Sequence, residues 1–384
     1  MLKTNRLLGG ILLVAGTSIG AGMLALPVMV AFAGFIPSFA ALALSWLFMF
    51  TTAYLILEVN LAFPGNVNMI TMAGKTLGVA GKIVCWVVYL LLLYSLTAAY
   101  IAGCAPLFLQ MIEVIFGSQV PVWIGAFPLL ILFGFFVYFG TRTVDYVNRL
   151  LMIGLIIAYF ALIVFLPSYI DFNLLKRIDF SAVWGAIPVI FTSYGFHIVI
   201  PSLTTYLHHD SRKLKAAIFI GSLIPLIVYC VWVFLVLGVV PLTGLYGAWE
   251  GGFSATIPLA SLIASPWISN IASAFAFFAM ITSFLGVSLS LSDFLGDGLR
   301  LHRFTWGREF ACLITFIPPL LFVLTYQRGF LLALQYAGLF VVILLGLLPP
   351  LMAWKLPTYK HWFKRAVLLL IILISLFVGV LCLS

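Results

Sequence analysis

Residues 7–57 form an uninterrupted run of 51 residues that contains no charged side chain. A run this long and apolar belongs in a membrane, because one transmembrane helix needs only about 20 such residues. Within it, residues 16–27 read Gly-Thr-Ser-Ile-Gly-Ala-Gly-Met-Leu-Ala-Leu-Pro, and the glycines and Pro27 disfavour a continuous helix. Backbone groups freed by a loosened membrane helix are tolerated only beside protein or a polar cavity. The segment therefore predicts a discontinuous helix that holds a ligand, which is typical of transporters.

Composition extends this prediction to the whole chain of 384 residues. The chain is 65% hydrophobic and 8% charged, whereas soluble domains carry roughly 25% charged residues. We therefore expect an all-α polytopic membrane protein without a domain outside the bilayer. The net charge of +9 does not indicate a nucleic-acid partner, because the basic residues fall in short clusters between apolar spans. The five cysteines lie inside these spans without a CxxC pair, so neither a disulfide nor a metal site is expected.

The apolar spans and the turn residues between them predict eleven transmembrane helices. They cover residues 7–34, 36–60, 83–112, 121–140, 147–167, 183–206, 215–240, 267–295, 308–326, 330–354 and 364–383. All but three of the 19 lysines and arginines then fall on one side of the membrane, the exceptions being Lys176, Arg177 and Arg328. The positive-inside rule places the N-terminus in the cytoplasm and the C-terminus outside. The longest outer loop, 241–266, is expected to contain a short lid helix at 261–264.

The sixth span carries a second interruption, since Pro188, Gly195 and Pro201 all lie within it. Interrupted helices in corresponding halves of a membrane protein are typical of a transporter's binding site. An alternative stays open for the first interruption, because Gly16-x-x-x-Gly20 is also a motif for close helix packing.

The spacing of the two interruptions predicts an inverted repeat. They lie five spans apart, and an odd number of spans makes the second unit enter the membrane in the opposite sense. The chain, 1–384, would thus be one membrane domain with repeats at about 7–167 and 183–354 and an extra helix at 364–383.

Three segments resemble one known family. Residues 16–27 resemble the first helix of the bacterial aromatic amino acid permeases, the tyrosine and tryptophan permeases, and Tyr194-Gly-Phe-His197 with Pro201-Ser-Leu203 resembles their sixth. Residues 282–299 resemble their eighth helix. This family belongs to the amino acid–polyamine–organocation superfamily and is similar in fold to LeuT, with five-plus-five inverted repeats. The resemblance implies secondary active uptake of an aromatic amino acid, driven by an ion gradient and usually by protons, without a cofactor.

The resemblance also implies where the substrate head group binds. The carboxylate is expected at the N–H groups of Ala21 and Gly22, with Gly20 beside them. The N-terminus of a half-helix carries unpaired donors and positive partial charge, which suit a carboxylate. The amino group is expected at carbonyls near Gly16 and Thr17.

Further substrate contacts are expected from the third, sixth and eighth spans. They are Tyr94, Thr97, Tyr100, Ile190, Ser193, Phe196 and Val287. Carbonyls around Ile190 and Ser193 would also receive the amino group, and Phe196 is the best aromatic wall of the side-chain pocket. Tyr94 and Tyr100 would reach the carboxylate or stack on the ring, or alternatively pack between helices.

The coupling ion is left open between proton and sodium. In sodium-coupled relatives one site uses polar residues at the positions of Met23 and Phe191, so that site is expected to be absent here. A second site would use the carbonyls of Gly16 and Ile19 with two hydroxyls of the eighth span. These hydroxyls survive as Thr282 and Ser283. The resemblance favours protons, and sodium at this second site is the alternative.

Two ionisable side chains inside spans are candidates for proton coupling. His197 has an unperturbed pKa of about 6.5, which suits a proton switch, although buried histidines more commonly serve packing. Glu58 lies near the cytoplasmic boundary and would alternatively be an interfacial carboxylate, paired with Lys75 or Lys82. Asp293 and Asp297, at the end of the eighth span, are interpreted as gate charges or as solvated residues.

The sequence as a whole favours a proton-driven symporter that imports an aromatic L-amino acid, with tyrosine preferred. A uniporter or channel is the alternative, but polar residues concentrate at mid-depth instead of lining a continuous path. An enzyme is disfavoured, because the metal-binding motif HExxH does not occur. The expected partners are the substrate and the lipid bilayer, with no nucleic acid and no obligate protein partner. The expected location is a bacterial inner membrane.

Overall fold

The computed structural model describes residues 6–117, 120–263, 265–326 and 328–383, and every regular element in these ranges is a helix. The first predicted span is discontinuous, as expected. It consists of α1 (Arg6–Ser18) and α2 (Gly22–Val30), which meet at a bend of 52°.

The sixth predicted span is also discontinuous, as expected. After the short turn η4 (Ser181–Ala186), α7 (Ile187–Ser193) ends at the predicted interruption. The chain resumes as the 3₁₀ turn η5 (Phe196–Val199) and continues into α8 (Ile200–Tyr206). Both predicted breaks are thus real interruptions of the helical backbone.

The remaining spans are long helices. They are α3 (Phe35–Leu61), α4 (Met69–Phe116), α6 (Thr141–Phe165), α9 (Ser211–Val239), α12 (Pro266–Gly298), α13 (Gly307–Thr325), α14 (Gly329–Val341) with the π-helical η7 (Val342–Leu347) and α15 (Leu348–Ala353), and α16 (Trp362–Leu381). In the described ranges nine helices are long and apolar enough to cross a membrane, or ten when the bent pair counts as one span. The predicted span 121–140 corresponds to η1 (Val122–Ala126) and α5 (Phe127–Phe139). This apolar helix is shorter than the nine counted above, so the predicted count of eleven spans is not confirmed.

Short helices occupy several connections. They are η2 (Leu166–Tyr169), η3 (Leu174–Lys176), α10 (Leu242–Gly251), α11 (Thr256–Leu262), η6 (Leu301–Arg303) and η8 (Pro357–Tyr359). Loop 241–266 therefore holds two helices instead of the one expected at 261–264, and Ala264 lies outside the described residues.

Helix α4 begins well before the predicted residue 83. The side chain of Asn68 accepts a hydrogen bond from the N–H of Thr71 at 2.9 Å and caps a helical segment that the apolar pattern does not reveal. Gly78, with φ of +76°, bends this segment into the long membrane helix. Lys75 and Lys82 are therefore helical residues and not loop residues.

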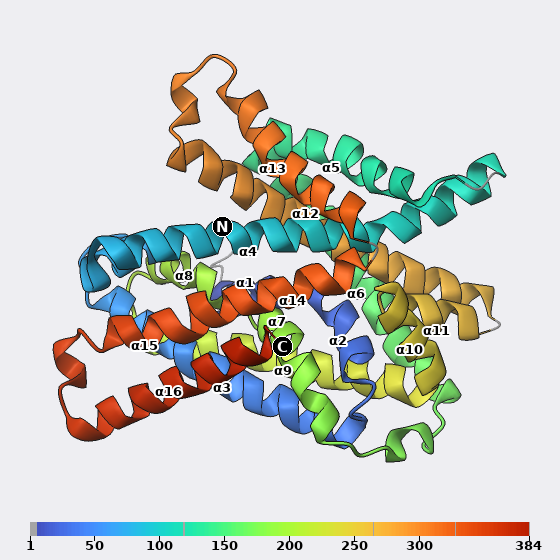
Figure 1. Cartoon of the computed structure of the whole chain (residues 1–384), viewed down its shortest axis with the longest axis horizontal. Coiled ribbons are helices and arrows are strands. Elements are labelled where there is room, and N and C mark those ends of the chain that lie inside the picture. The colour runs from blue at the N-terminus through green and yellow to red at the C-terminus, as the bar shows by residue number, and fades with distance from the viewer. Residues whose placement is uncertain (1–5, 118–119, 264, 327, 384) are drawn as a thin grey trace.

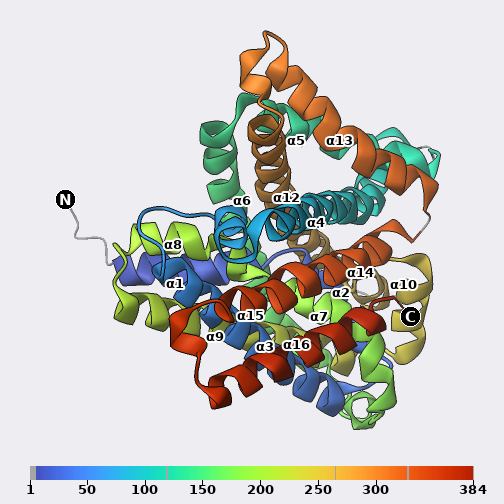
Figure 2. The same cartoon turned by 60° about the vertical axis from the view of Figure 1, so that its left-hand side comes forward.

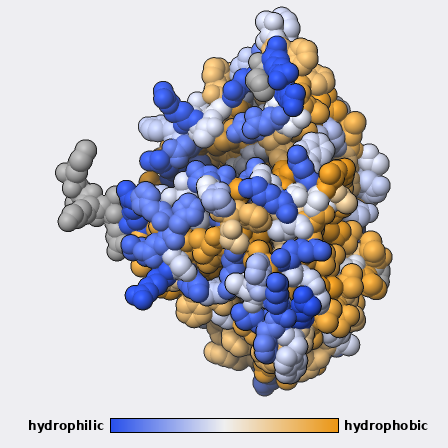
Figure 3. All heavy atoms as spheres, turned by 90° about the vertical axis from the view of Figure 1, so that its left-hand side faces the viewer, coloured by the Kyte–Doolittle hydropathy of each residue, from blue (hydrophilic) through white to orange (hydrophobic). Residues whose placement is uncertain are grey.

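The two broken spans lie in the middle of the molecule (Figures 1 and 2). Helices α5, α6, α12 and α13 lie on one side of them, and α3, α9 and α16 lie on the other. Helix α1 packs on α9, and α2 packs on both α7 and α9. Hydrophilic side chains gather on the end of the molecule shown in Figure 3, next to hydrophobic flanks. The inverted repeat at 7–167 and 183–354 stays a prediction.

Candidate functional site

A cavity of about 430 Å³ lies where the two broken spans meet. Residues of α1, α4, α6, α7, α12 and α14 line it together with the first break, and the lining is mostly apolar. It opens toward the end of the molecule where α1 begins, because Leu12, Leu13 and Ser290 line it there and are exposed. Beyond the break, α2 is buried almost throughout, so the opposite end is closed.

The first break presents both kinds of free backbone group to this cavity. Among the described residues, no hydrogen bond engages the N–H of Gly20 or Gly22, or the carbonyls of Gly16 and Thr17. All four residues line the cavity. The end of α1 therefore offers acceptors and the start of α2 offers donors, with the matching partial charges of helix termini. Between them, the N–H of Ala21 donates to Ser283 Oγ at 3.0 Å.

Two of the glycines in this break lie in close contact with a serine of another helix. A Cβ on Gly20 would collide with Ser283 Oγ, and one on Gly22 would lie 3.0 Å from Ser193 Oγ. A Cβ on Gly16 would meet nothing within 4 Å. The contact between Gly22 and Ser193 brings the first break directly against the end of α7.

The structure brings most of the predicted substrate residues together. Those that line the cavity are Gly16, Thr17, Gly20, Ala21, Gly22, Tyr100, Ser193 and Val287. Ile190 and Phe196 are fully buried behind the lining. Tyr94 and Thr97 also lie outside it.

The geometry of helix α4 explains the separation of its three predicted residues. The Tyr94 hydroxyl donates to the carbonyl of Ile314 on α13 at 2.7 Å, and the Thr97 hydroxyl donates to that of Leu93 at 2.8 Å. Tyr94 and Tyr100 are six residues apart, so their directions differ by about 120° around the helix. Only Tyr100 therefore faces the cavity.

The predicted sodium ligands share one wall of the cavity. Ile19, Thr282 and Ser283 all line it beside Gly16. The Thr282 hydroxyl donates to the carbonyl of Phe278 at 2.8 Å. The carbonyls of Gly16 and Ile19 accept no hydrogen bond from any described residue. Four oxygens of the kind that a hard cation prefers thus belong to residues that line the same cavity.

The two proton-coupling candidates lie outside the cavity lining. His197 is fully buried, with Nε2 2.9 Å from the hydroxyl of Thr52 on α3 and Nδ1 unpartnered among the described residues. The Glu58 carboxylate accepts a hydrogen bond from the Tyr359 hydroxyl at 2.5 Å. Burial, followed by this carboxylate, raises the pKa of Tyr359.

The charges expected near these groups are arranged differently from the prediction. Within the described ranges, no ion pair joins Glu58 to Lys75 or Lys82, and the ammonium of Lys75 lies over the ring of Phe63 at 5.0 Å. Asp293 and Asp297 are exposed at the end of α12. They form no ion pair with a described residue.

Two polar residues of the site were not predicted. The buried Oδ1 of Asn148, on α6, has no partner among the described residues, and Asn148 lines the cavity. The Tyr229 hydroxyl on α9 contacts the ends of α1 and α7. The only signal in the sequence is the presence of each polar group within a membrane span, which by itself does not reveal the direction in which the side chain points.

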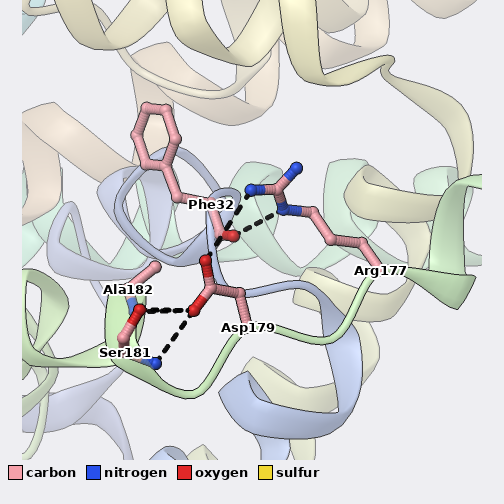
Figure 4. Close-up of polar contacts among 5 residues, drawn as sticks. All are labelled: Phe32, Arg177, Asp179, Ser181 and Ala182. Carbon is pink, nitrogen blue, oxygen red and sulfur yellow. Dashed lines mark hydrogen bonds and ion pairs between the residues drawn. The ribbon is translucent and has the colours of Figure 1, made fainter.

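At the closed end, one loop ties the outer ends of both broken spans (Figure 4). Arg177 Nε donates to the carbonyl of Phe32, just after α2, at 2.6 Å. Asp179 Oδ1 accepts hydrogen bonds from the hydroxyl of Ser181 at 2.6 Å and from its N–H at 3.0 Å, at the start of η4. The N–H of Ala182 adds a third at 3.3 Å. These bonds to Ser181 and Ala182 lower the pKa of Asp179.

An aromatic cluster covers the same end. The rings of Phe32 and Trp249 meet edge to face, with centroids 5.6 Å apart. The Arg328 guanidinium lies 4.2 Å from the centroid of the Trp249 ring and donates to the Trp249 carbonyl at 2.8 Å. Helix α10 is thereby fastened to the start of α14.

Two solved structures share the fold of this chain. The structure of MhsT in complex with L-phenylalanine matches with a TM-score of 0.63 and 14% identity, covering 97% of this chain and 98% of that one. A manganese transporter of Eremococcus coleocola matches with a TM-score of 0.58 and 15% identity, covering 98% of this chain and 85% of the other. These likenesses confirm the LeuT-type fold.

Sequence relatives are closer. The tyrosine-specific transport system 1 of Haemophilus influenzae is 34% identical, over 97% of this chain and 96% of its own length. The tryptophan-specific transport protein of the same organism is 33% identical, over 91% of this chain and 88% of its length. The match to the tryptophan/tyrosine permease family covers residues 3–382, nearly the entire chain. The chain is thus a membrane transport protein and not an enzyme, and it belongs to the tryptophan/tyrosine permease family.

Proposed function

We propose that this permease imports an aromatic L-amino acid, with tyrosine preferred, by proton symport across a bacterial inner membrane. One observation carries the proposal: the first break offers free donors and free acceptors to the same cavity. A zwitterionic head group needs both, and a single break supplies them at Gly20 and Gly22 for the carboxylate and at Gly16 and Thr17 for the amino group.

The remaining cavity suits an aromatic side chain. Its volume of about 430 Å³ is within the usual range for small-molecule sites, and apolar walls with few polar groups are typical of such sites. Tyr100 and Val287 line it beyond the head-group seat. The curated relatives include transporters of both tyrosine and tryptophan at nearly equal identity, so the preference for tyrosine rests on the resemblance alone.

The proposed orientation places the N-terminus in the cytoplasm. Under this orientation the cavity opens to the cytoplasm in the present structure, and the Arg177 and Arg328 contacts close the outer side. The positive-inside distribution of lysine and arginine supports this assignment.

Sodium symport is the second candidate, because the carbonyls of Gly16 and Ile19 and the hydroxyls of Thr282 and Ser283 share one cavity wall. Uptake of radiolabelled tyrosine into proteoliposomes, with proton and sodium gradients imposed separately, tests both proposals. We expect a proton gradient alone to drive accumulation, with excess unlabelled tyrosine, tryptophan and phenylalanine as competitors.

Three other results would decide otherwise. Accumulation driven only by sodium would replace the proton by the alternative ion. Equilibration without accumulation under either gradient would indicate a uniporter. Competition by aliphatic amino acids as strong as that by aromatic ones would contradict the substrate class.

A further inference from the structure

The hydroxyl of Tyr229 joins the two broken spans at their interruptions. Its oxygen lies 2.6 Å from the carbonyl oxygen of Ser18 and 2.8 Å from that of Ser193. Ser18 is the last residue of α1, and Ser193 is the last residue of α7. One phenol proton from α9 is therefore shared between the C-terminal carbonyls of two half-helices that lie 175 residues apart in the chain.

The two carbonyls need such a donor. The last carbonyls of a helix have no partner within the helix and carry its negative partial charge. Ser18, Ser193 and Tyr229 are all buried, with no more than 6% of any of them exposed. Two negative helix ends that face each other in a buried place require a cation or a hydrogen-bond donor between them. The chain supplies the donor itself.

The junction also fixes the head-group seat. Gly16 and Thr17, whose carbonyls accept no hydrogen bond from the residues that the structure describes, directly precede Ser18. On the other side, Gly22 lies against Ser193, since a Cβ on it would be 3.0 Å from Ser193 Oγ. Tyr229 itself lies behind the cavity lining. Its hydroxyl therefore acts on the substrate only through the backbone that it holds.

We propose that Tyr229 is a positioning residue for substrate binding: its hydroxyl holds the ends of α1 and α7 together and keeps the first break in the geometry that grips an amino acid head group. This inference rests on the proposed function for its effect on transport. The hydrogen bonds that carry it are independent of that function.

Tyr229→Phe removes the hydroxyl and keeps the ring. Tyr159→Phe is the matched control, because the Tyr159 hydroxyl on α6 donates to the carbonyl of Val228, on the same helix as Tyr229, at 3.0 Å. Each variant thus loses one phenol bonded to backbone, but only Tyr229→Phe releases the broken spans. In proteoliposomes we expect Tyr229→Phe to raise KM by about tenfold or more, and by a similar factor for every transported amino acid, since all share the head group. The control is expected to stay within about twofold.

Rescue at position 229 tests the donor itself. p-Aminophenylalanine offers two N–H donors on the same ring, and p-methoxyphenylalanine keeps the oxygen without its proton. We expect the amino form to restore KM to within about threefold of the wild type and the methoxy form to behave like phenylalanine. If Tyr229→Phe does not insert into the membrane, uptake is compared between the p-aminophenylalanine and p-methoxyphenylalanine variants instead. Equal uptake by these two variants would overturn the proposal.

Amide hydrogen exchange provides a readout that needs no substrate. We expect segments 16–24 and 190–199 to exchange faster in Tyr229→Phe than in Tyr159→Phe. Unchanged exchange in both segments, or a KM that rises equally in the two variants, would overturn the positioning role. A wild-type protein that transports no aromatic amino acid would instead refute the proposed function, and exchange would still decide the role of Tyr229.

Discussion

The two breaks face the same cavity but leave their backbones in opposite states. The first, at Ile19–Ala21, leaves donors and acceptors without partners among the described residues. At the second, at Tyr194–Gly195, three successive N–H groups find carbonyls within the turn, at 3.0 to 3.2 Å. Buried aromatic side chains, Tyr194 and Phe196, flank it. The first break therefore has groups free for a ligand, whereas these three N–H groups of the second break are satisfied within their own turn.

The comparison shows that an interruption in a membrane helix is not by itself a binding site. What matters is whether the released N–H and C=O groups form hydrogen bonds locally. Unpaired backbone groups in a buried cavity cost free energy, and a ligand that forms hydrogen bonds with them removes this cost. The two spans are also tied at two levels, by Tyr229 at the breaks and by Arg177 and Asp179 at the outer ends. Substitutions in the first break should therefore act on binding more strongly than those in the second.

The largest effect is expected from Gly22→Leu. A side chain here would enter the space against Ser193 and cover the N–H groups that await a carboxylate, so we expect uptake to fall at least about a hundredfold while the protein still inserts. Gly296→Leu on α12 is the control, because a Cβ there meets nothing within 4 Å. Uptake and membrane content are measured together, and near-normal uptake by Gly22→Leu would remove the proposed seat.

A smaller effect is expected from Ser283→Ala, which removes the acceptor of the Ala21 N–H. The freed N–H makes the first break less defined, and one such hydrogen bond is worth about 1 kcal/mol, so KM should rise about fivefold. Ser288→Ala is the control, since the one bond of this buried hydroxyl in the described part of the chain is to the carbonyl of Phe284 on the same helix. Equal KM values for the two variants would show that Ser283 does not support the break.

The sequence predicts the first break and its cavity residues well, because the glycines act through local backbone preferences. Pro27, in contrast, lies inside helix α2. It does not predict contacts that depend on how helices rotate against each other. Tyr94 was expected beside the substrate and instead bonds to α13, and Glu58 finds Tyr359 rather than a lysine. The sequence does not predict the role of Tyr229 for the same reason. Its hydroxyl bonds to two carbonyls that are far away in the chain, and a tyrosine in an apolar span gives no local signal of these contacts.

The second break becomes functional only if His197 carries a proton. We expect His197→Gln to flatten the pH dependence of uptake, because glutamine cannot take up the proton that the imidazole binds. Its Nδ1 is free for a proton, but the ring is closed off from the cavity, so the second break would have to move during transport. Thr52→Val is the control, because it removes the same hydrogen bond without an ionisable group. A pH profile like that of the wild type would make His197 a packing residue and the second break a static wall.

The smallest effect is expected from Asp179→Asn at the outer tie. The hydrogen bonds from Ser181 and Ala182 lower the pKa of this carboxyl in the folded state, so its contribution to stability is complete above the unfolded value of about 3.9 and is lost as the pH falls through the lower folded value. We therefore expect the variant to melt about 1–2 °C below the wild type at pH 7 and to match it only when the pH is below the folded value. Asp210→Asn, which removes the negative charge of a similar cap at the start of α9, should lower the melting temperature likewise but leave KM unchanged. A rise in KM for Asp179→Asn but not for Asp210→Asn would show that the outer ends of the two broken spans are coupled to the head-group seat at the first break. An unchanged KM for both variants would leave Tyr229 as the contact that sets the spacing of the two spans at their breaks.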